Sequence, residues 1–293
     1  MLDWILRRIP RWLVWKIAQR YIAGTSLEGA VAVVRRMNDE GFVVALSYLG
    51  EHSTRAEQCD QALTQYLEIL ETIHRLKLRA QLSVKPSQLG LPLDFGTFLQ
   101  RTVALLTRAS ALGIFVRLDM EDSKHTQSTL LAYRILRRRF PNIGTALQAT
   151  LHRSKTDAAS LLDGETNLRV CKGIYPEPRS IAWQRPPEIW RHYLQIVLLL
   201  MRRRAFVALA THNERMLRRL EKLVAQVGLP PERYIFEMLL GVRFTRARQL
   251  LAAGHPVLLY VGFGAEWYEF ALRRMHESPQ LIWLGIRGLF SRT

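Results

Sequence analysis

The chain has 293 residues, of which 48% are hydrophobic, so it can bury the core of one large domain or two modest ones, and its composition excludes a disordered chain. Its 42 lysines and arginines outnumber 25 acidic residues, and the net charge of +17 attracts anions such as nucleic acid, an anionic membrane or a phosphate-bearing cofactor. The sequence contains no zinc-finger spacing, no sustained basic heptads and no apolar run near the ~20 residues that cross a bilayer.

Residues 1 to 40 precede the first predicted strand, and we expect them to form an N-terminal arm of one or two helices. The first sixteen residues mix three tryptophans with several cations, which is typical of an interfacial amphipathic segment. We therefore expect peripheral contact with an anionic membrane through residues 1–16. The alternative is that this segment packs against the rest of the chain or closes a dimer.

Eight short apolar runs follow, and each is succeeded by a longer stretch with helical periodicity. The runs cover residues 42–49, 79–85, 113–120, 144–150, 168–174, 205–212, 234–240 and 256–263. Strands that alternate with helices predict a parallel sheet. Eight repeats without a linker favour a closed (βα)8 barrel of the TIM type over an open sheet, so we assign residues 41–293 to an α/β barrel with a C-terminal helical tail.

Two of the intervening helices carry the spacing of a capping box. Thr54 and Glu57 precede the helical pattern after the first strand, and Thr211 and Glu214 precede the one after the sixth. Because a hydroxyl at the cap and a carboxylate three residues later can each bind a free backbone amide, we expect both helices to begin there.

Polar residues occur near the carboxyl ends of almost all the predicted strands, where barrel enzymes carry their sites. They are Lys85, Asp119, Gln148, Arg169, His212, Glu237 and Tyr260. Each alone has a simpler interpretation: a solvated strand end, a core histidine, or a glutamate paired with a nearby arginine. Together they predict one polar mouth, because the ends of barrel strands converge and an unpaired buried charge is unfavourable.

The last predicted helix, residues 267–277, places Phe270, Arg273, Arg274 and Glu277 on one face. Two guanidinium groups beside an apolar ring suit a small ligand with a carboxylate at one end and an apolar part at the other. The alternative is a surface arginine pair that Glu277 neutralises.

In this order along the chain, several motifs resemble the proline dehydrogenase family, over residues 25 to 290, and the length resembles its compact single-function bacterial members. The motifs are Ser83-Val-Lys85, Asp119-Met-Glu121, Gln148, Arg169-Val-Cys-Lys172-Gly-Ile-Tyr175, Thr211-His212-Asn213, Phe236-Glu237-Met238-Leu239, Tyr260 and Arg273-Arg274-x-x-Glu277.

The resemblance implies a distorted (βα)8 barrel with FAD across its mouth, and a final helix that carries the substrate arginines. It implies oxidation of L-proline to 1-pyrroline-5-carboxylate by hydride transfer from C5 to FAD N5, with electrons passed to a quinone. Asp119 and Arg169 are then expected to be catalytic, and no metal is expected. The residues implied to bind substrate are Lys85, Tyr260, Phe270, Arg273 and Arg274. Those implied to bind FAD are Met120, Gln148, Arg169, Lys172, Gly173, Ile174, Thr211, His212 and Glu237.

Two positions depart from the family pattern: Phe270 replaces a frequent tyrosine, and Ile174 replaces a usual alanine. The first leaves open a preference for hydroxyproline or another secondary amino acid. A catalytically silent basic barrel that binds membrane or nucleic acid is the remaining alternative, although we expect no nucleic-acid partner.

Cys59 and Cys171 lie far apart and give no disulfide framework, and no secretory signal is evident. We therefore expect a cytoplasmic protein, peripheral at the inner face of the cell membrane if residues 1–16 bind it, while the oligomeric state stays open.

Overall fold

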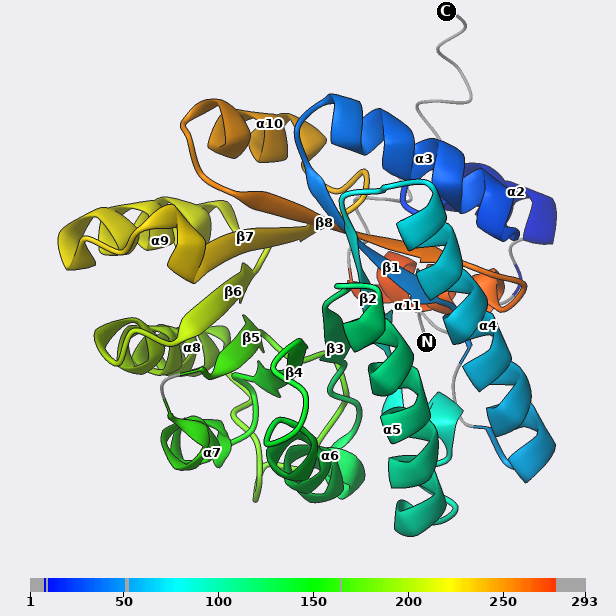
Figure 1. The fold of residues 1–293 in the computed structure, drawn as a ribbon. Coiled ribbons are helices and arrows are strands. Elements are labelled where there is room, and N and C mark those ends of the chain that lie inside the picture. The colour runs from blue at the N-terminus through cyan, green and yellow to red at the C-terminus, as the bar shows by residue number, and fades with distance from the viewer. Residues whose placement is uncertain (1–7, 9, 51–52, 164, 278–293) are drawn as a thin grey trace, which may run out of the picture.

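The computed structural model describes residues 8, 10–50, 53–163 and 165–277, and within them eight parallel strands form a closed barrel in chain order (Figure 1). The strands are β1 (Val43–Tyr48), β2 (Ala80–Val84), β3 (Val116–Leu118), β4 (Ile143–Gln148), β5 (Asn167–Cys171), β6 (Phe206–Ala210), β7 (Tyr234–Leu239) and β8 (Val257–Phe263). All eight predicted runs, and the barrel that they predicted, are confirmed. Six of the strands lie within the predicted runs, whereas β4 and β5 each begin one residue earlier and end two and three residues sooner.

The barrel closes where β1 pairs with β8, in a register that sets Ala45 opposite Tyr260. On β3, Val116 and Leu118 belong to the hydrophobic core, whereas Arg117 and Asp119 make polar contacts with neighbouring strands. Because successive side chains on a strand point to opposite faces, one face of β3 packs on the helices and the other forms a polar interior.

Helices surround the barrel and bury apolar stripes against the outside of the strands. They are α3 (Leu27–Asp39), α4 (Ala56–Arg75), α5 (Phe95–Ala111), α6 (Ser123–Leu136), α7 (Ser154–Leu161), α8 (Pro186–Arg202), α9 (Glu214–Val227) and α10 (Phe244–Ala252). Two 3-10 helices, η1 (Pro86–Leu89) and η2 (Pro231–Arg233), lie between these elements.

Both predicted capping boxes were placed too early in the chain. Helix α4 begins at Ala56, where the Gln58 side chain accepts hydrogen bonds from the backbone amides of Thr54 and Arg55. Helix α9 begins at Glu214, and the Asn213 side chain accepts from the amide of Met216. Asparagine is as good a cap as the hydroxyl residues, so the helix begins where Asn213 can serve rather than at Thr211.

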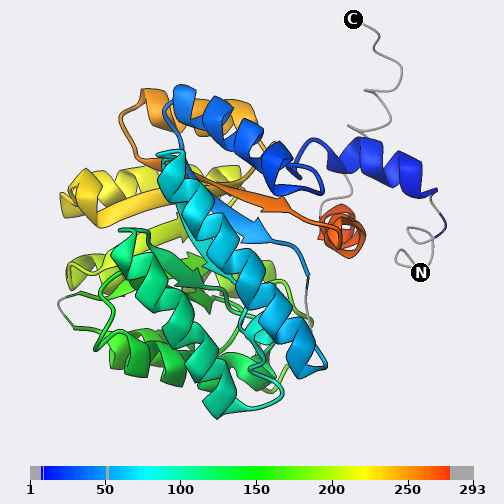
Figure 2. The ribbon, with the colours of Figure 1, turned by 45° about the vertical axis from the view of Figure 1, so that its right-hand side comes forward.

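The N-terminal arm contacts two different parts of the molecule. Helix α3 packs on β1 and β8, whereas α2 (Arg11–Ala18) packs against α11 (Trp267–Glu277), away from the other helices (Figure 2). Val14 and Ile17 are buried there with Met275, and the Trp15 and Trp267 rings lie 4.6 Å apart. Residues 11–18 therefore pack against the chain, as the alternative interpretation stated, and the division of the chain at residue 40 stays a prediction.

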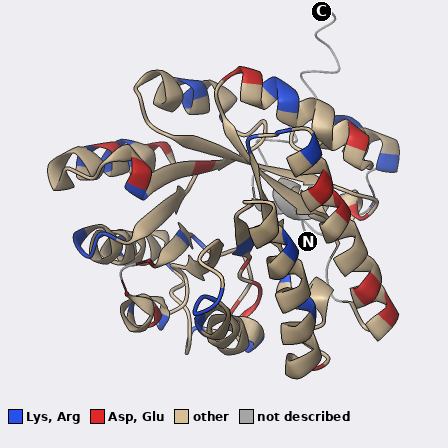
Figure 3. Cartoon of the chain, in the orientation of Figure 1, with Lys and Arg blue, Asp and Glu red and all other residues tan. Residues whose placement is uncertain are grey.

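Basic and acidic positions are interspersed on the outer helices (Figure 3). Arg108 pairs with Glu71 across α5 and α4, and Arg248 pairs with Glu40 between α10 and the end of α3. Within the described ranges, no helix combines the length and apolar character needed to cross a membrane.

Candidate active site

Asp119 is the centre of a buried hydrogen-bond network at the carboxyl end of β3. Its Oδ1 atom accepts from Ser83 Oγ at 2.6 Å and from Arg169 Nη1 at 2.5 Å, and its Oδ2 atom accepts from the Tyr260 hydroxyl at 2.9 Å. The Tyr260 hydroxyl also lies 2.7 Å from Ser47 Oγ. Side chains of β2, β5 and β8 thus meet at one carboxylate that follows β3 and is only 7% exposed, and Ser47 of β1 is joined to it through Tyr260.

Arg169 joins that carboxylate to a second one on β7. Its Nε atom donates to Glu237 Oε2 at 2.8 Å, and its Nη2 atom lies 2.7 Å from Glu237 Oε1. This two-pronged pairing matches the planar fork of a guanidinium group. The interpretation of Glu237 as the partner of a nearby arginine is confirmed, and its predicted contact with a cofactor stays a prediction.

The charges of this Asp119–Arg169–Glu237 network support one another. Burial alone would raise the pKa of Asp119, but Arg169, Lys85 and the hydrogen bonds from Ser83 and Tyr260 hold it below its ordinary value. Burial opposes the charge of Arg169, but Glu237 and Asp119 raise its pKa above the usual value. Burial and the nearby Asp119 charge both raise the pKa of Tyr260. At neutral pH Asp119 is therefore ionised, Arg169 is cationic and Tyr260 is a neutral phenol, and Glu237 forms an ion pair with Arg169.

Lys85 lies at the end of β2 and is 7% exposed. Its backbone amide donates to the buried Tyr66 hydroxyl at 3.3 Å, and η1 follows directly. The Glu121 carboxylate accepts from both the amide and the hydroxyl of Ser87 in η1, at 2.7 and 2.6 Å. The segment that presents Lys85 is thereby fixed to the segment that presents Asp119.

The residues predicted to bind FAD lie at the carboxyl ends of β3 to β7. Gln148 is buried and donates to the Glu121 carbonyl at 2.7 Å, and Met120 and Thr211 are also buried. His212 Nε2 accepts from the amide of Leu239 at 2.8 Å, which fixes its ring between β6 and β7.

Close backbone approach is built in at Gly173. Its φ is +99°, and a Cβ atom there would lie 2.1 Å from Thr150 Oγ1, so no other residue fits without strain. The flanking Lys172 and Ile174 are exposed, and Ile174 is 44% exposed. Lys172 supplies a cation, Gln148 an amide, Thr211 a hydroxyl and Ile174 an exposed apolar side chain. Such groups suit a ligand that has both phosphates and a flat ring, so the residues present fit the expected cofactor.

Cys171 lies two residues after Arg169 on β5 and is poorly suited to act as a nucleophile. Burial raises the pKa of its thiol to about 11, although Arg169 lowers it. The thiolate that a nucleophile requires is therefore scarce at neutral pH.

Helix α11 carries the predicted substrate arginines, but the side chains of Arg273 and Arg274 lie outside the part of the chain that the structure describes. Phe270 is 6% exposed and belongs to the apolar cluster that α2 and α11 share. The predicted substrate contacts of all three residues stay predictions.

The sequence interpretation missed two members of the site. Ser47 on β1 binds Tyr260, and Arg117 on β3 lies fully buried inside the barrel, two residues before Asp119. The available signal was the alternation of the strand, which places residues 117 and 119 on one face.

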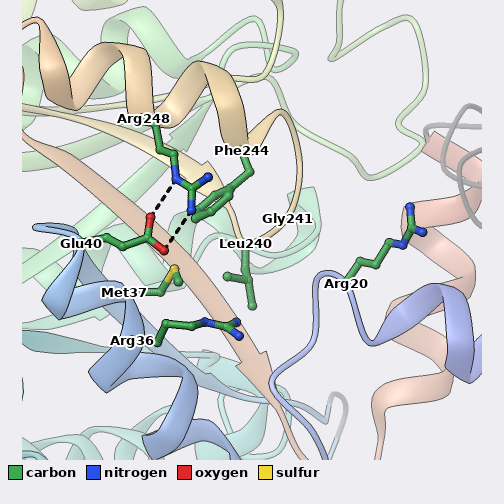
Figure 4. Close-up of a pocket in the computed structure, with 8 residues that line it drawn as sticks. All are labelled: Arg20, Arg36, Met37, Glu40, Leu240, Gly241, Phe244 and Arg248. Carbon is green, nitrogen blue, oxygen red and sulfur yellow. Dashed lines mark hydrogen bonds and ion pairs between the residues drawn. The ribbon is translucent and has the colours of Figure 1, made fainter. Parts of the chain in front are cut away.

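A separate surface pocket between α3 and the β7–α10 region contains none of the predicted site residues (Figure 4). Arg248 and Glu40 pair across it, at 2.8 Å between Nε and Oε2, beside Phe244 and Met37. Figure 4 shows the Arg20 guanidinium directed away from this ion pair. Within this pocket Arg248 and Glu40 are paired with each other.

Comparison with known proteins gives a consistent result. The family model described as proline dehydrogenase matches residues 30–171 and 180–279. Proline dehydrogenase 1 of Bacillus subtilis is 30% identical over 275 residues, which are 94% of this chain and 91% of that protein. Proline dehydrogenase of Deinococcus radiodurans is 30% identical over 289 residues, which are 97% and 93% of the two chains.

Solved structures share the fold. Proline utilization A from Bdellovibrio bacteriovorus, inactivated by N-propargylglycine, superposes with a TM-score of 0.84 at 20% identity, over 89% of this chain and 32% of that one. A mutant of the Bradyrhizobium japonicum protein of that name gives 0.73 at 18% identity, over 88% and 30% of the two chains. This chain spans about a third of either protein.

Proposed function

Because the chain belongs to the proline dehydrogenase family, we propose that it oxidises L-proline to 1-pyrroline-5-carboxylate, with FAD as its cofactor and a quinone as its electron acceptor. The reaction removes two electrons and two protons from proline and forms the C5–N double bond. One hydrogen leaves C5 with the electron pair, and the other leaves the nitrogen as a proton.

The observation that carries the proposal is the Asp119–Arg169–Glu237 network with Tyr260 at the barrel mouth. These four side chains come from four strands and meet within hydrogen-bond distance of one another. Such a buried set of fixed charges needs no reorganisation during reaction, which is the main way in which proteins stabilise charge transfer. A silent barrel gives no reason to bury two carboxylates and a guanidinium together.

Substrate recognition is assigned to cations around this network. Lys85, Arg273 and Arg274 are proposed to hold the proline carboxylate, since planar guanidinium groups bind its two oxygens together. Asp119 balances the positive charge and keeps Arg169 and Tyr260 in place. In a site of this positive character the substrate amine loses its proton more easily, because its cationic form is disfavoured.

The cofactor is proposed to lie across the ends of β4, β5 and β6. Lys172, Thr211 and His212 would hold its phosphates near the start of α9, and Gln148, Gly173 and Ile174 would contact its ring system. When bound, FAD supplies the two-electron acceptor that protein side chains lack. Arg169 contributes a fixed positive charge that favours the arrival of negative charge at the mouth.

Contact with a membrane quinone is proposed to involve the N-terminal arm. Trp12 is 61% exposed and lies beside Lys16, whose Nζ atom is 5.5 Å from the indole centre. Val14 and Ile17 are buried against α11 and Arg11 lies over its Trp267 and Tyr268 rings, so Trp12 and Lys16 are the residues proposed to meet lipid. Co-sedimentation with anionic vesicles should fall for a Trp12→Glu variant and for a chain that lacks residues 1–9. Equal partitioning of all forms would contradict the contact.

The proposal is tested by steady-state oxidation of L-proline with a soluble quinone, in which the cyclic imine product is trapped and identified. Arg273→Met and Arg274→Met should each raise the KM for L-proline more than they lower kcat. Competition with 4-hydroxyproline measures the preference that Phe270 leaves open, with Phe270→Tyr as the paired variant. Absence of imine product, or an unchanged KM in both arginine variants, would contradict the proposal.

A further inference from the structure

Arg117 is a fully buried arginine beneath the site, and the mechanism above does not use it. It is 1% exposed and lies on β3 two residues before Asp119. Its Nη1 atom donates to the Thr145 carbonyl at 3.1 Å and its Nη2 atom to Asn167 Oδ1 at 2.8 Å. Its Nε atom is buried without a hydrogen-bond partner in the described part of the chain.

The barrel interior is shaped to hold this side chain. A Cβ atom at Gly144, opposite Arg117 in the strand register, would lie 2.8 Å from Arg117 Nη1. The Phe115 ring lies 5.1 Å from the guanidinium carbon, within the range of a cation–π contact. Asn167 precedes Arg169 by two residues on β5, so the residue that holds Arg117 lies on the same strand face as Arg169.

The bonded partners of Arg117 are a carbonyl and an amide, both uncharged, so its positive charge acts at a distance. Burial and repulsion from Arg169 lower its pKa to about 10, whereas Glu237, Tyr133 and Asp119 raise it. The group is therefore still cationic at neutral pH. Two carboxylates, Asp119 and Glu237, are then offset by two guanidinium groups, one in contact with them and one beneath them.

We propose that Arg117 is a positioning residue: its buried positive charge offsets the second carboxylate of the Asp119–Arg169–Glu237 network, and so keeps Asp119 ionised and the network from carrying a net negative charge. Without it, the network would carry an extra negative charge next to the place assigned to the cofactor and the substrate carboxylate. The proposal therefore predicts easier reduction of the cofactor when Arg117 is present. This prediction about cofactor reduction rests on the proposed function.

Other groups also act on Asp119, and they define the background of the test. Arg169 and Cys171 face it from β5, Lys85 from the end of β2, Tyr260 from β8, and Tyr66 from α4. Glu237 on β7 shares Arg169 with it. All of these side chains are retained in a variant at residue 117, so the variant removes only the charge of Arg117.

The first measurement uses the flavin-free protein and therefore does not depend on the proposed function. The lowered pKa of Asp119 stabilises the fold above its unfolded-state pKa, and this contribution is lost as the pH falls through the folded-state pKa. Because the charges of Arg117 and Asp119 attract each other, the stability lost in Arg117→Met should be larger at pH ~7 than at pH ~3, as measured by urea unfolding. A loss that is the same at both pH values means that Arg117 is only a packing residue, and overturns the proposal.

The second measurement is the midpoint potential of the FAD-loaded protein. Arg117→Met should shift the equilibrium toward oxidised cofactor by about tenfold, which is about 30 mV for a two-electron couple. Arg117→Lys retains the charge and should stay close to the wild type, although it loses the planar fork. An unchanged potential in Arg117→Met, or an equal shift in both variants, would overturn the proposal.

If Arg117→Met does not fold, Asn167→Asp decides the question. It places a carboxylate where Asn167 Oδ1 now accepts from Arg117 at 2.8 Å, so it cancels the charge and retains the arginine. The potential should then fall as predicted for Arg117→Met, and a potential equal to that of the wild type would overturn the proposal. A protein that binds no FAD would refute the proposed function instead, and leaves the flavin-free measurement to decide the role of Arg117.

Discussion

Replacing Arg169 with methionine removes the cation that both buried carboxylates share. Arg169 lies 2.5 Å from Asp119 and 2.7 Å from Glu237, and the three side chains are 7%, 10% and 4% exposed. Removal of one partner from a buried ion pair typically destabilises a protein by about 3–5 kcal/mol, because a charge is left without compensation. The folding equilibrium constant should thus fall by roughly two to four powers of ten near neutral pH.

The dependence on pH gives the sharper test. In the wild type, the lowered pKa of Asp119 stabilises the folded protein at pH values above the pKa that Asp119 has in the unfolded chain. This contribution is lost only when the pH falls below about 4. In Arg169→Met, burial is no longer offset by Arg169, so the pKa of Asp119 should rise above its ordinary value. Protonation then favours the folded variant, and its stability should increase as the pH falls from ~7 to ~5.

The assay is urea unfolding of the flavin-free protein, followed by circular dichroism at several pH values. Arg108→Met breaks the exposed pair with Glu71 and serves as the matched control, with a pH dependence like that of the wild type. If Arg169→Met followed the same pH dependence as the wild type, the assignment of Arg169 as the charge that compensates Asp119 would be refuted.

Three further predictions concern other parts of the site. Tyr260→Phe removes the hydroxyl that donates to Asp119, so kcat/KM for L-proline should fall about 10- to 100-fold, and unchanged steady-state kinetics would contradict this role. Gly173→Ala forces a side chain into a position with φ of +99°, and should lower the ratio of visible to ultraviolet absorbance that reports bound FAD; a full complement of FAD would show that close approach is not needed. Val14→Glu places a charge in the buried contact between α2 and α11, and should raise the KM for L-proline, whereas Trp12→Glu on the exposed face should leave this KM unchanged. Equal KM values in the two variants would show that the packing of α2 does not affect substrate binding.

The barrel could be predicted from the sequence because both faces of its strands are buried. One face packs on the helices and the other faces the barrel interior, so each strand appears in the sequence as a short apolar run. The first residue of each helix was harder to predict, since several possible capping residues occur within a few positions. Thr211 and Asn213 are both good caps, and only the path of the chain after β6 decides that Asn213 serves α9.

The residues at the mouth could be predicted because the ends of barrel strands converge, but their pairing could not. Arg169 is 50 residues from Asp119 and 68 from Glu237 along the chain, so only the closed barrel shows that they share a guanidinium group. Arg117 was missed because it lies in the middle of β3, where an apolar residue is expected and where depth inside the barrel cannot be read from sequence.

The decisive experiment for flavin-dependent proline oxidation is the visible absorption spectrum of the purified protein, recorded without oxygen before and after addition of L-proline. We expect flavin bands that bleach with L-proline and persist with D-proline, together with formation of the cyclic imine. Flavin bands that do not respond to L-proline, or a colourless protein that does not take up added FAD, would contradict it.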